Sequence, residues 1–376
     1  MILIGADFVP TAGNYGLFCD GNSTALFGEE LAALLSAADF RIFNLETPLC
    51  DELNPIKKNG PHLSAPADCV KGYIAAEADL LTLANNHILD QGSQGLQSTW
   101  NSLKRNGIDT VGSGVNIHDA AKPYLFDCYG KRIGVYACAE HEFSVADENT
   151  AGANPFDPLD SPDHIAALKA ACDFVIVLYH GGKEYYRYPS PRLQKTCRTL
   201  IGKGADLVLC QHSHCIGCEE RYRNGVIVYG QGNFLFDKSS REEWQTALLV
   251  GIDEKLRVVY YPLVKCSGGV RLAPTDKANE IMDGFHQRSE EIKADGFVRK
   301  NYEAFSKQML GSYLMAINGR HSAVFRALNK LSGYRLNRFA LRKYGEAEMI
   351  CLQNYFDCEA HRELISEGLR QKSRTQ

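Results

Sequence analysis

The stretch Gly204-Ala-Asp-Leu-Val-Leu-Cys-Gln-His-Ser-His214 joins a short apolar run to a polar loop with two histidines. The run Leu207-Val-Leu209 predicts a buried strand, because a half-exposed strand would alternate apolar and polar residues. The same pattern, an apolar run followed by a polar loop, recurs at residues 2–4, 40–43, 80–83, 133–136, 174–178 and 226–229. The sequence therefore predicts a series of buried strands that end in polar loops.

Helical patterns separate these strands, at residues 29–38, 93–106, 164–171 and 191–203, so that strand and helix alternate. Two further apolar segments, 246–252 and 256–264, flank a polar turn and predict an antiparallel hairpin. We expect a layered α/β/β/α domain over residues 1–275. Long helical patterns, including 280–294 and 297–315, then predict a helical C-terminal region over residues 276–376.

The composition is that of a soluble globular protein, with 376 residues, 45% hydrophobic and 23% charged. A net charge of -4 argues against a general nucleic-acid partner, which would require a strongly basic surface. We find no signal peptide before Asp7 and no apolar run long enough for a transmembrane segment. The 13 scattered cysteines favour reduced thiols, and hence a cytoplasmic location.

Polar side chains follow the predicted strands one after another. In open α/β sheets such residues converge at the carboxyl ends of the strands, where ligands bind. A single histidine there is usually an ordinary hydrogen-bonded group, but several carboxylate, amide and imidazole groups together predict a metal site. Oxygen and imidazole donors in combination suit Mn, Fe or Zn. The residues are Asp7, Asn44, Glu46, Asn86, His87, His180, His212 and His214.

Six segments of the chain carry a recognisable pattern: Gly5-Ala-Asp7, Asn44-Leu-Glu46, Leu83-Ala-Asn-Asn-His-Ile-Leu-Asp-Gln-Gly92, His180-Gly-Gly-Lys-Glu-Tyr185, residues 204–214 and Tyr229-Gly-Gln-Gly-Asn-Phe234. In this order they resemble the bacterial capsule synthesis proteins of the CapA, or poly-γ-glutamate capsule, type within the calcineurin-like metallophosphoesterase superfamily. The resemblance covers roughly residues 1–265, and Lys58 to Pro66 also looks like the family's Lys/Pro loop. It implies a four-layer metallophosphoesterase-like sandwich with a helical C-terminal extension.

The resemblance also implies a role for each matching residue. One or two divalent metal ions would be held by Asp7, Glu46, Asn86, His180, His212 and His214. Glu46 would touch both metals. His180 and His212 would complete one metal, and Asp7 and His214 would hold the other. His87 would act as a general acid and Asp90 would orient its ring, although Asp90 could also be an ordinary acidic residue of a first helical turn.

Four residues near the site are candidates for substrate contact: Lys58, His62, Glu184 and Asn233. A surface loop or a solvated helix start is the alternative for the first three. The turn at Gly232-Asn233 has a purely structural alternative. One departure from the superfamily pattern concerns the metals, since Val9 stands where Asp-x-His would place an imidazole. A single-metal site is therefore an open alternative.

Two kinds of function fit these expectations. The first is a metal-dependent hydrolase, acting on a phosphoester or on an amide of an acidic polymer, linked to capsule or poly-γ-glutamate synthesis. The second is a non-catalytic polymer-binding accessory protein with a degenerate metal site. The expected partners are an anionic polymer or a phosphorylated substrate, and a capsule synthesis complex.

The C-terminal region carries basic residues with no acidic residue among them before Glu346. Such a local positive field would attract an acidic polymer or dock the protein on a synthesis complex. The alternative is a packed helix pair whose basic face is solvated. The basic residues are Arg320, Arg326, Lys330, Arg335, Arg338, Arg342 and Lys343.

Overall fold

The computed structural model describes residues 1–237, 240–317, 322–357, 360–362, 364–366 and 369. The chain packs as two units, residues 1–298 and 299–376. Helix α8 (Thr275–Glu291) belongs to the first unit, although a separate helical region was expected from residue 276. Its Phe285 is fully buried, with its ring 5.0 Å from that of Tyr260. Packing of this kind ties the helix to the sheet beneath it.

The first sheet has a parallel part and an antiparallel part. Its order is β16-β15-β14-β1-β2-β3-β4, and β13 pairs with the end of β1. β1 to β4 run parallel, whereas β14, β15 and β16 are antiparallel, which confirms the hairpin expected at residues 246–264. The strands are β1 (Ile2–Val9), β2 (Phe40–Asn44), β3 (Leu80–Thr82), β4 (Asp109–Val111), β13 (Leu235–Phe236), β14 (Thr246–Ile252), β15 (Val258–Cys266) and β16 (Gly269–Leu272).

The second sheet has four parallel central strands between two antiparallel edges, in the order β11-β12-β10-β9-β7-β6. The two edge strands were not expected from the sequence. The strands are β6 (Tyr124–Cys128), β7 (Lys131–Ala139), β9 (Phe174–His180), β10 (Leu207–Gln211), β11 (Glu219–Tyr222) and β12 (Gly225–Val228). A small separate pair consists of β5 (Ser113–Gly114) and β8 (Gly152–Ala153).

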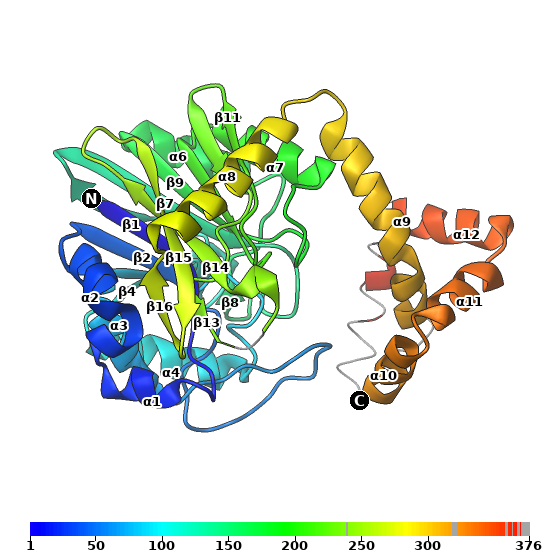
Figure 1. Ribbon diagram of the computed structural model, residues 1–376, viewed down its shortest axis with the longest axis horizontal. Coiled ribbons are helices and arrows are strands. Elements are labelled where there is room, and N and C mark those ends of the chain that lie inside the picture. Colours follow the sequence, from blue (N-terminus) through cyan, green and yellow to red (C-terminus); the bar gives the residue numbers. More distant parts are fainter. Residues whose placement is uncertain (238–239, 318–321, 358–359, 363, 367–368, 370–376) are drawn as a thin grey trace. The chain divides into compact units, whose positions relative to one another are not determined.

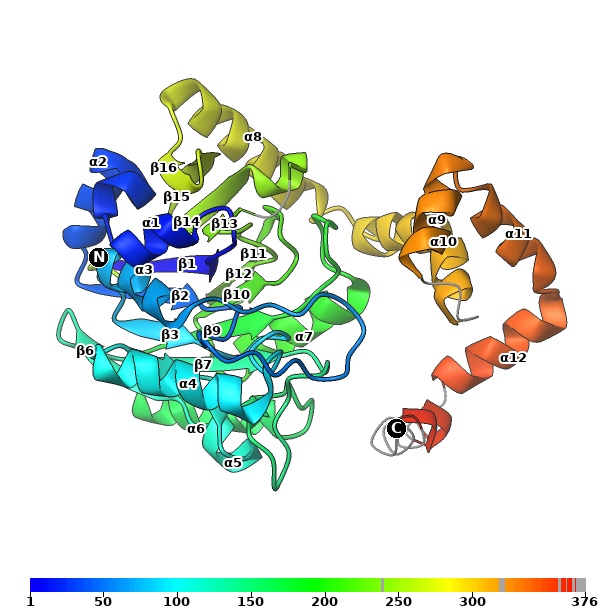
Figure 2. The same cartoon turned by 90° about the horizontal axis from the view of Figure 1, so that it is seen from below.

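Helices cover the outer faces of the two sheets, α1 to α4 on the first and α6 with α7 on the second (Figures 1 and 2). Apolar residues of both sheets meet between them, for example Ile4 with Ile176 and Leu209 in one buried cluster. The expected α/β/β/α layering is therefore confirmed. The helices are α1 (Tyr15–Asp20), α2 (Ser23–Ser36), α3 (Val70–Ala75), α4 (Gly92–Arg105), α5 (Ile117–Ala120), α6 (Ser161–Ala171) and α7 (Pro191–Gly202), with short 3₁₀ turns η1 (Ala67–Cys69) and η2 (Glu242–Trp244).

The second unit contains α10 (Ala323–Leu331), α11 (Arg335–Lys343), α12 (Glu346–Asp357) and most of α9 (Phe297–Ile317). Leu314, Met315 and Ala340 form its small buried core. The basic residues from Arg326 to Lys343 are exposed, whereas Arg320 lies outside the described residues. No helix in the described part of the chain is long and apolar enough to cross a membrane. The described cysteines are all free thiols.

Candidate metal centre

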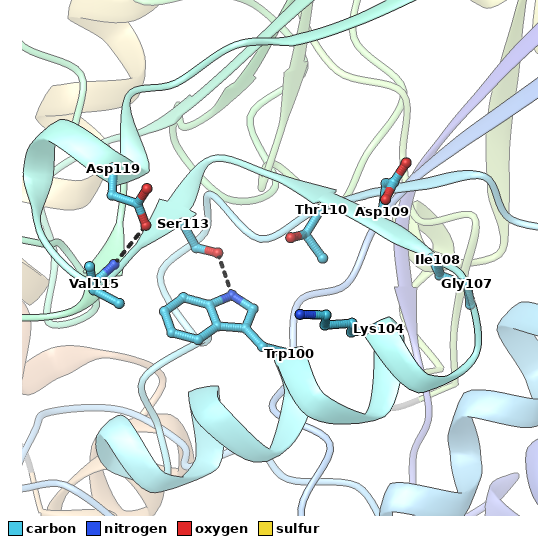
Figure 3. A pocket seen from close by; sticks show the side chains of 9 residues that line it. All are labelled: Trp100, Lys104, Gly107, Ile108, Asp109, Thr110, Ser113, Val115 and Asp119. Atoms are coloured by element: carbon cyan, nitrogen blue, oxygen red, sulfur yellow. Dashed lines mark hydrogen bonds between the residues drawn. The ribbon is translucent and has the colours of Figure 1, made fainter.

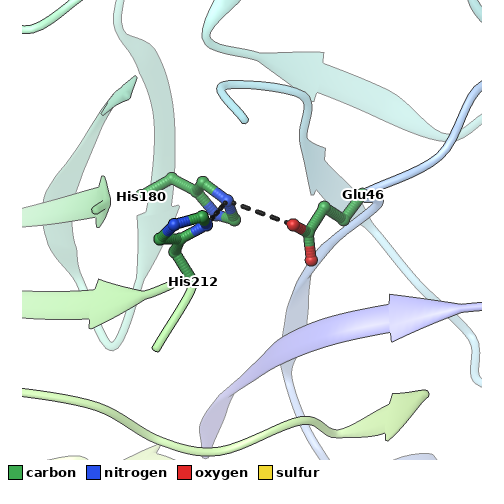
Figure 4. Close-up of side chains that lie close together, drawn as sticks. All are labelled: Glu46, His180 and His212. Atoms are coloured by element: carbon green, nitrogen blue, oxygen red, sulfur yellow. Dashed lines mark hydrogen bonds and ion pairs between the residues drawn. The ribbon is translucent and has the colours of Figure 1, made fainter. Parts of the chain in front are cut away.

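Strand register brings the polar residues at the carboxyl ends of the strands together. Asp7 of β1 lies opposite Asn44 of β2, and His180 of β9 lies opposite Gln211, immediately before His212. Two sets of three side chains result, each with candidate ligand atoms within 4.8 Å of one another. We call them the His212 group (Glu46, His180 and His212; Figure 4) and the His214 group (Asp7, Glu46 and His214).

Glu46 belongs to both groups, and its surroundings are unusual for a carboxylate. The side chain is fully buried, yet neither of its oxygens accepts a hydrogen bond within the described structure. Burying a carboxylate without donors is strongly unfavourable, unless a cation compensates for the lost hydration. The nearest basic group is His180, whose Nε2 lies 3.3 Å from Glu46 Oε1. This donor-free carboxylate fits a residue that binds metal.

The His212 group converges on Nε2 of His180. That nitrogen lies 3.2 Å from Nδ1 of His212 and 3.0 Å from Oδ1 of Asn86. The Asn86 amide nitrogen donates to Oε2 of Glu142 at 3.2 Å, which fixes the amide with its oxygen toward His180. Burial, followed by the charge of neighbouring His180, holds the pKa of His212 well below its usual value. His212 is therefore neutral near pH 7, the form in which imidazole binds metal.

The His214 group is held as an ion pair. Nδ1 of His214 lies 3.2 Å from Oδ2 of Asp7 and donates to Oδ1 of Asn233 at 2.8 Å. Burial alone would lower the pKa of His214, but the hydrogen bond to Asp7 and the charges of Glu46 and Asp7 raise it to about 9. Burial would raise the pKa of Asp7, but the bond to His214 outweighs this effect and lowers it. Near pH 7 this group therefore carries a proton.

Asn44 connects the two groups, a role that was not assigned from the sequence. Its amide nitrogen donates to Oδ1 of Asp7 at 2.7 Å and lies 3.3 Å from Nδ1 of His180. Its amide oxygen accepts from Asn85 at 3.0 Å. Asn44 ends β2 directly before the loop with Glu46, so its position at a strand end was the available signal.

The loop after β10 directs both histidines through an unusual backbone. His212 has φ 79° and His214 has φ 54°, in the left-handed region that residues other than glycine rarely adopt. Backbone conformations of this kind cost free energy and cluster at functional sites. Here they place two imidazoles, two positions apart in one loop, into two different ligand groups.

Val9 stands at the position where an Asp-x-His pattern would place an additional imidazole. It is buried in an apolar cluster with Phe236 and Trp244, packed by Leu63 and Tyr185. The Trp244 ring lies 4.7 Å from the ring of His214. The His214 group is thus bordered by apolar side chains on this side.

His87 and Asp90 form a separate pair beside the two groups. Nδ1 of His87 donates to Oδ2 of Asp90 at 2.6 Å, and this carboxylate is fully buried. Lys58 forms an ion pair with Oδ1 of Asp90, and its ammonium group lies 3.2 Å from Nδ1 of His87. The Leu63 amide also donates to Asp90, at 2.6 Å. The carboxylate is thereby fixed, and with it the orientation of the imidazole.

A cavity of about 340 Å³ opens onto these residues. Lys58 and Glu184, two of the four candidates for substrate contact, line it. His62 is not among the lining residues, and its Nε2 lies 2.5 Å from the carbonyl of Ile56. Asn233 is buried behind His214. Lining residues that were not singled out from the sequence are Glu142, Phe236 and Trp244.

Another hollow, of about 390 Å³, lies near β4 and α4, with Trp100, Lys104 and Asp109 in its lining (Figure 3). The indole nitrogen of Trp100 donates to Ser113 at 2.9 Å. Neither group of candidate ligands includes a residue of this hollow. The cavity beside the His212 and His214 groups is therefore the candidate site.

Comparisons with known proteins agree on one family. The chain is 30% identical over 224 residues to the capsule biosynthesis protein CapA of Bacillus anthracis, covering 57% of this chain and 54% of that one. It is 30% identical to the PGA biosynthesis protein CapA of Bacillus subtilis, covering 57% and 58%. A probable polyglutamine synthesis accessory protein of Mycobacterium tuberculosis is also 30% identical, with 56% and 59% covered. The chain thus spans little more than half the length of these relatives.

Solved structures are more distantly similar. A putative 5'-nucleotidase from Staphylococcus aureus matches with a TM-score of 0.42 and 15% identity, covering 76% of this chain and 58% of that one. A phosphatase from Mycoplasma pneumoniae matches with a TM-score of 0.41 and 17% identity, covering 70% and 92%. Likenesses of this size do not bear on function. The model of the bacterial capsule synthesis protein family PGA_cap, in contrast, matches residues 11–238, and because this is more than half of the sequence, the chain belongs to that family.

Proposed function

We propose that this chain is a metal-dependent hydrolase that acts on an acidic polymer, or on a phosphoester, in capsule-related synthesis. The observation that carries the proposal is the fully buried Glu46 carboxylate, which accepts no hydrogen bond within the described structure, forms an ion pair with Nε2 of His180 at 3.3 Å, and is shared by two sets of imidazole and carboxylate ligands. A buried carboxylate compensated only by imidazoles is costly in a purely structural role. It is favourable where a divalent cation binds.

The donor set suits one or two ions of Mn, Fe or Zn. Glu46, His180, His212 and the amide oxygen of Asn86 would hold one ion, and Asp7, Glu46 and His214 the other. When bound, such an ion supplies a Lewis acid that activates water and stabilises the negative charge that develops during hydrolysis. The fixed orientation of Asn86, through Glu142, supports its use as a ligand.

His87 is proposed to give a proton to the leaving atom. Its Nδ1 is occupied by Asp90, so Nε2 is the nitrogen left for proton transfer. Lys58 neutralises Asp90 and holds it in place. Lys58 is among the residues that line the cavity, but its side chain is 3% exposed and its charge is paired with Asp90, so its role is to position the pair of His87 and Asp90.

The names of two relatives favour an acidic chain as substrate, since they refer to capsule and PGA synthesis. In such a chain the bond to be cleaved is an amide, and each unit adds a carboxylate. A capsule synthesis complex is the proposed partner assembly. The phosphoester alternative requires the same metal chemistry.

The decisive experiment combines metal analysis with a substrate panel. Purified protein is assayed by elemental analysis, then tested on a phosphomonoester, a phosphodiester and a γ-glutamyl oligomer. We expect bound transition metal and hydrolysis of at least one substrate, abolished by chelation and restored by metal. Stoichiometric metal without turnover of any substrate would contradict the proposed hydrolase activity.

That outcome would favour the second candidate, a non-catalytic accessory protein that binds polymer through a degenerate metal site. The specific observation in its favour is Val9, whose apolar cluster with Phe236 and Trp244 takes the place of a further imidazole. The word accessory in the name of the Mycobacterium tuberculosis relative agrees with it. The retained pairing of His87 with Asp90 favours the hydrolase.

A further inference from the structure

A second cavity, of about 470 Å³, lies between β14, β15, η2 and α8. It is separate from the cavity beside the metal ligands, and the two share no lining residue. Its charged lining residues comprise four bases and two acids: Arg187, Lys265, Lys277, Arg288, Glu242 and Glu280. The cavity thus has more positive than negative groups within an otherwise acidic chain.

Its two arginines form no ion pair with any acidic residue that the structure describes. Arg187 donates to the carbonyl of Ile216 at 3.1 Å, and Arg288 donates through Nε to the carbonyl of Gly217 at 2.8 Å. No carboxylate in the described part of the chain forms an ion pair with either guanidinium. Burial, together with the nearby charge of Arg187, lowers the pKa of Arg288. Two like charges held close together, without a counter-ion, are unfavourable until an anion binds.

The two lysines differ in how far they are neutralised. Lys277 is paired with Glu280 at 2.6 Å, one turn away on α8. Lys265 contacts the carbonyl of Phe236 and the face of the Trp244 ring, 4.9 Å from its centroid, but forms no ion pair within the described structure. Positive charge therefore remains on Lys265 and on the two arginines, with exposed Glu242 as the unpaired acid.

The same residues connect this cavity to the metal site. Trp244 contacts residues of both sites: the Lys265 ammonium lies 4.9 Å from the centroid of its ring, and the His214 ring lies 4.7 Å from it. Arg187 belongs to the loop that also contributes Glu184 and Tyr185 to the metal-site cavity. Trp244 and this loop therefore place the two cavities near each other.

A purely structural role explains only part of this arrangement. The arginines hold the turn at Ile216 and Gly217, directly after the His212–His214 loop. Each guanidinium has five N–H donors, however, and one from each is used by these backbone carbonyls. The remaining donors form the forked geometry that matches a carboxylate or phosphate.

We propose that this second cavity is a subsite that binds a carboxylate of an acidic chain while a unit several residues away along the same chain occupies the metal site. The proposal rests on the proposed function for its ligand. It assigns the arginines the role of selecting long acidic chains over short ones, because only a long chain reaches both cavities.

The test measures binding of fluorescent γ-glutamyl dimer and octamer to full-length, metal-loaded protein. Arg187→Gln and Arg288→Gln each remove one charge, and Arg288→Lys keeps the charge but loses the fork. Lys277→Gln lies on the face of α8 and does not disturb the turn at Gly217. The matched control is Lys131→Gln, which also frees an acidic partner, Asp173 at 3.8 Å, on a strand outside the cavity.

We expect each glutamine variant of an arginine to weaken octamer binding about tenfold or more, since a hydrogen bond to a charged group contributes roughly 1.5–3 kcal/mol. Dimer binding and metal content should change far less, and Lys131→Gln should match the unmodified protein. The loss should shrink at high salt. Lys277→Gln should weaken octamer binding in the same direction by a smaller factor.

Octamer binding that is unchanged in the arginine and Lys277 variants would overturn the subsite, as would equal losses for dimer and octamer. A polyphosphate chain that binds more tightly than the octamer, in an arginine-dependent way, would overturn the assignment to carboxylate. The experiment tests the proposed function independently of the subsite. If the unmodified protein holds no metal or hydrolyses nothing, but octamer binding still depends on Arg187 and Arg288, the subsite stands and the hydrolase does not.

Discussion

The His212 group and the His214 group share Glu46, but burial and neighbouring charges shift the pKa values of His212 and His214 in opposite directions. In the His212 group, burial and the neighbouring His180 keep the pKa of His212 well below its usual value. In the His214 group, the Asp7 carboxylate overcomes the effect of burial and raises the pKa of His214 to about 9. His212 is thus a neutral imidazole, beside a His180 whose pKa is raised because the Glu46 charge outweighs burial, whereas His214 is stabilised in the protonated form.

This difference shows that the position of ligand residues at strand ends does not by itself determine the metal affinity of a site. Both groups combine imidazole with Glu46, but only the His212 group has a second imidazole and an amide oxygen nearby, from His180 and Asn86. The His214 group instead borders the apolar cluster of Val9 and Trp244. We therefore expect unequal affinities, with the His214 group the weaker.

The largest effect should come from Glu46→Ala, which removes a ligand from both groups at once. Loss of an outer-shell partner typically costs about 10- to 100-fold in metal affinity, so loss of this shared ligand should cost at least about 100-fold at each position. Isothermal titration with Mn or Zn and elemental analysis measure it. Glu184→Ala, which removes a carboxylate that lines the cavity but belongs to neither group, is the control. Full stoichiometry in Glu46→Ala would refute the site.

His87→Asn should separate catalysis from metal binding. Because His87 belongs to neither group, both metal positions should keep their affinity, while turnover falls about 10²- to 10⁴-fold, the usual contribution of general acid catalysis. The loss should be smaller for a substrate whose leaving group is already a weak base. Equal losses on activated and unactivated substrates would instead indicate that His87 is structural.

The pH dependence of metal binding should distinguish the two groups directly. Binding at the His214 group must displace the proton that Asp7 stabilises, so its affinity should rise about tenfold per pH unit up to the pKa of about 9. In the His212 group, His212 is already neutral, whereas the pKa of His180 is raised because the Glu46 charge outweighs the effect of burial. We expect the His212 group to bind metal at lower pH than the His214 group, and His214→Ala should abolish the event at higher pH. Two equivalents bound tightly at pH 6 would contradict the difference.

Much of this fold was predictable because its central strands are buried on both faces. Runs such as Val175 to Leu178 can only be buried strands, and the polar residues that follow them marked the site. Edge strands β6 and β11 were missed because their residues are half-exposed and alternate less clearly. Helix α8 looked like the start of a separate region, since the sequence does not reveal that Phe285 packs on Tyr260.

The candidate site was predictable to a similar depth. Residues that directly follow strands were found, and Glu142, three residues beyond the end of β7, could have been found by the same reasoning. The protonation of His214 could not be predicted, because it depends on Oδ2 of Asp7, which lies 3.2 Å from Nδ1 of His214. The contact of Trp244 with His214 joins residues thirty positions apart through tertiary packing alone.

The smallest effect, and the most direct test of the comparison, is expected from Val9→His. A second imidazole at this position would give the His214 group the ligand that it lacks, so occupancy of the weaker metal should rise, by about tenfold in affinity or less, within the range of one added contact. The gain is limited because Val9 is fully buried beside Phe236 and Trp244, where a larger polar ring must displace apolar packing and lose stability. Val9→Leu, which crowds the same cluster without a lone pair, controls for that packing cost. Titration at pH 8 measures both variants: a gain in Val9→His but not in Val9→Leu supports the asymmetry. If the unmodified protein already holds two metals with equal affinity, then Asp7, Glu46 and His214 suffice without the additional imidazole, and the two groups differ only in the proton that His214 must lose.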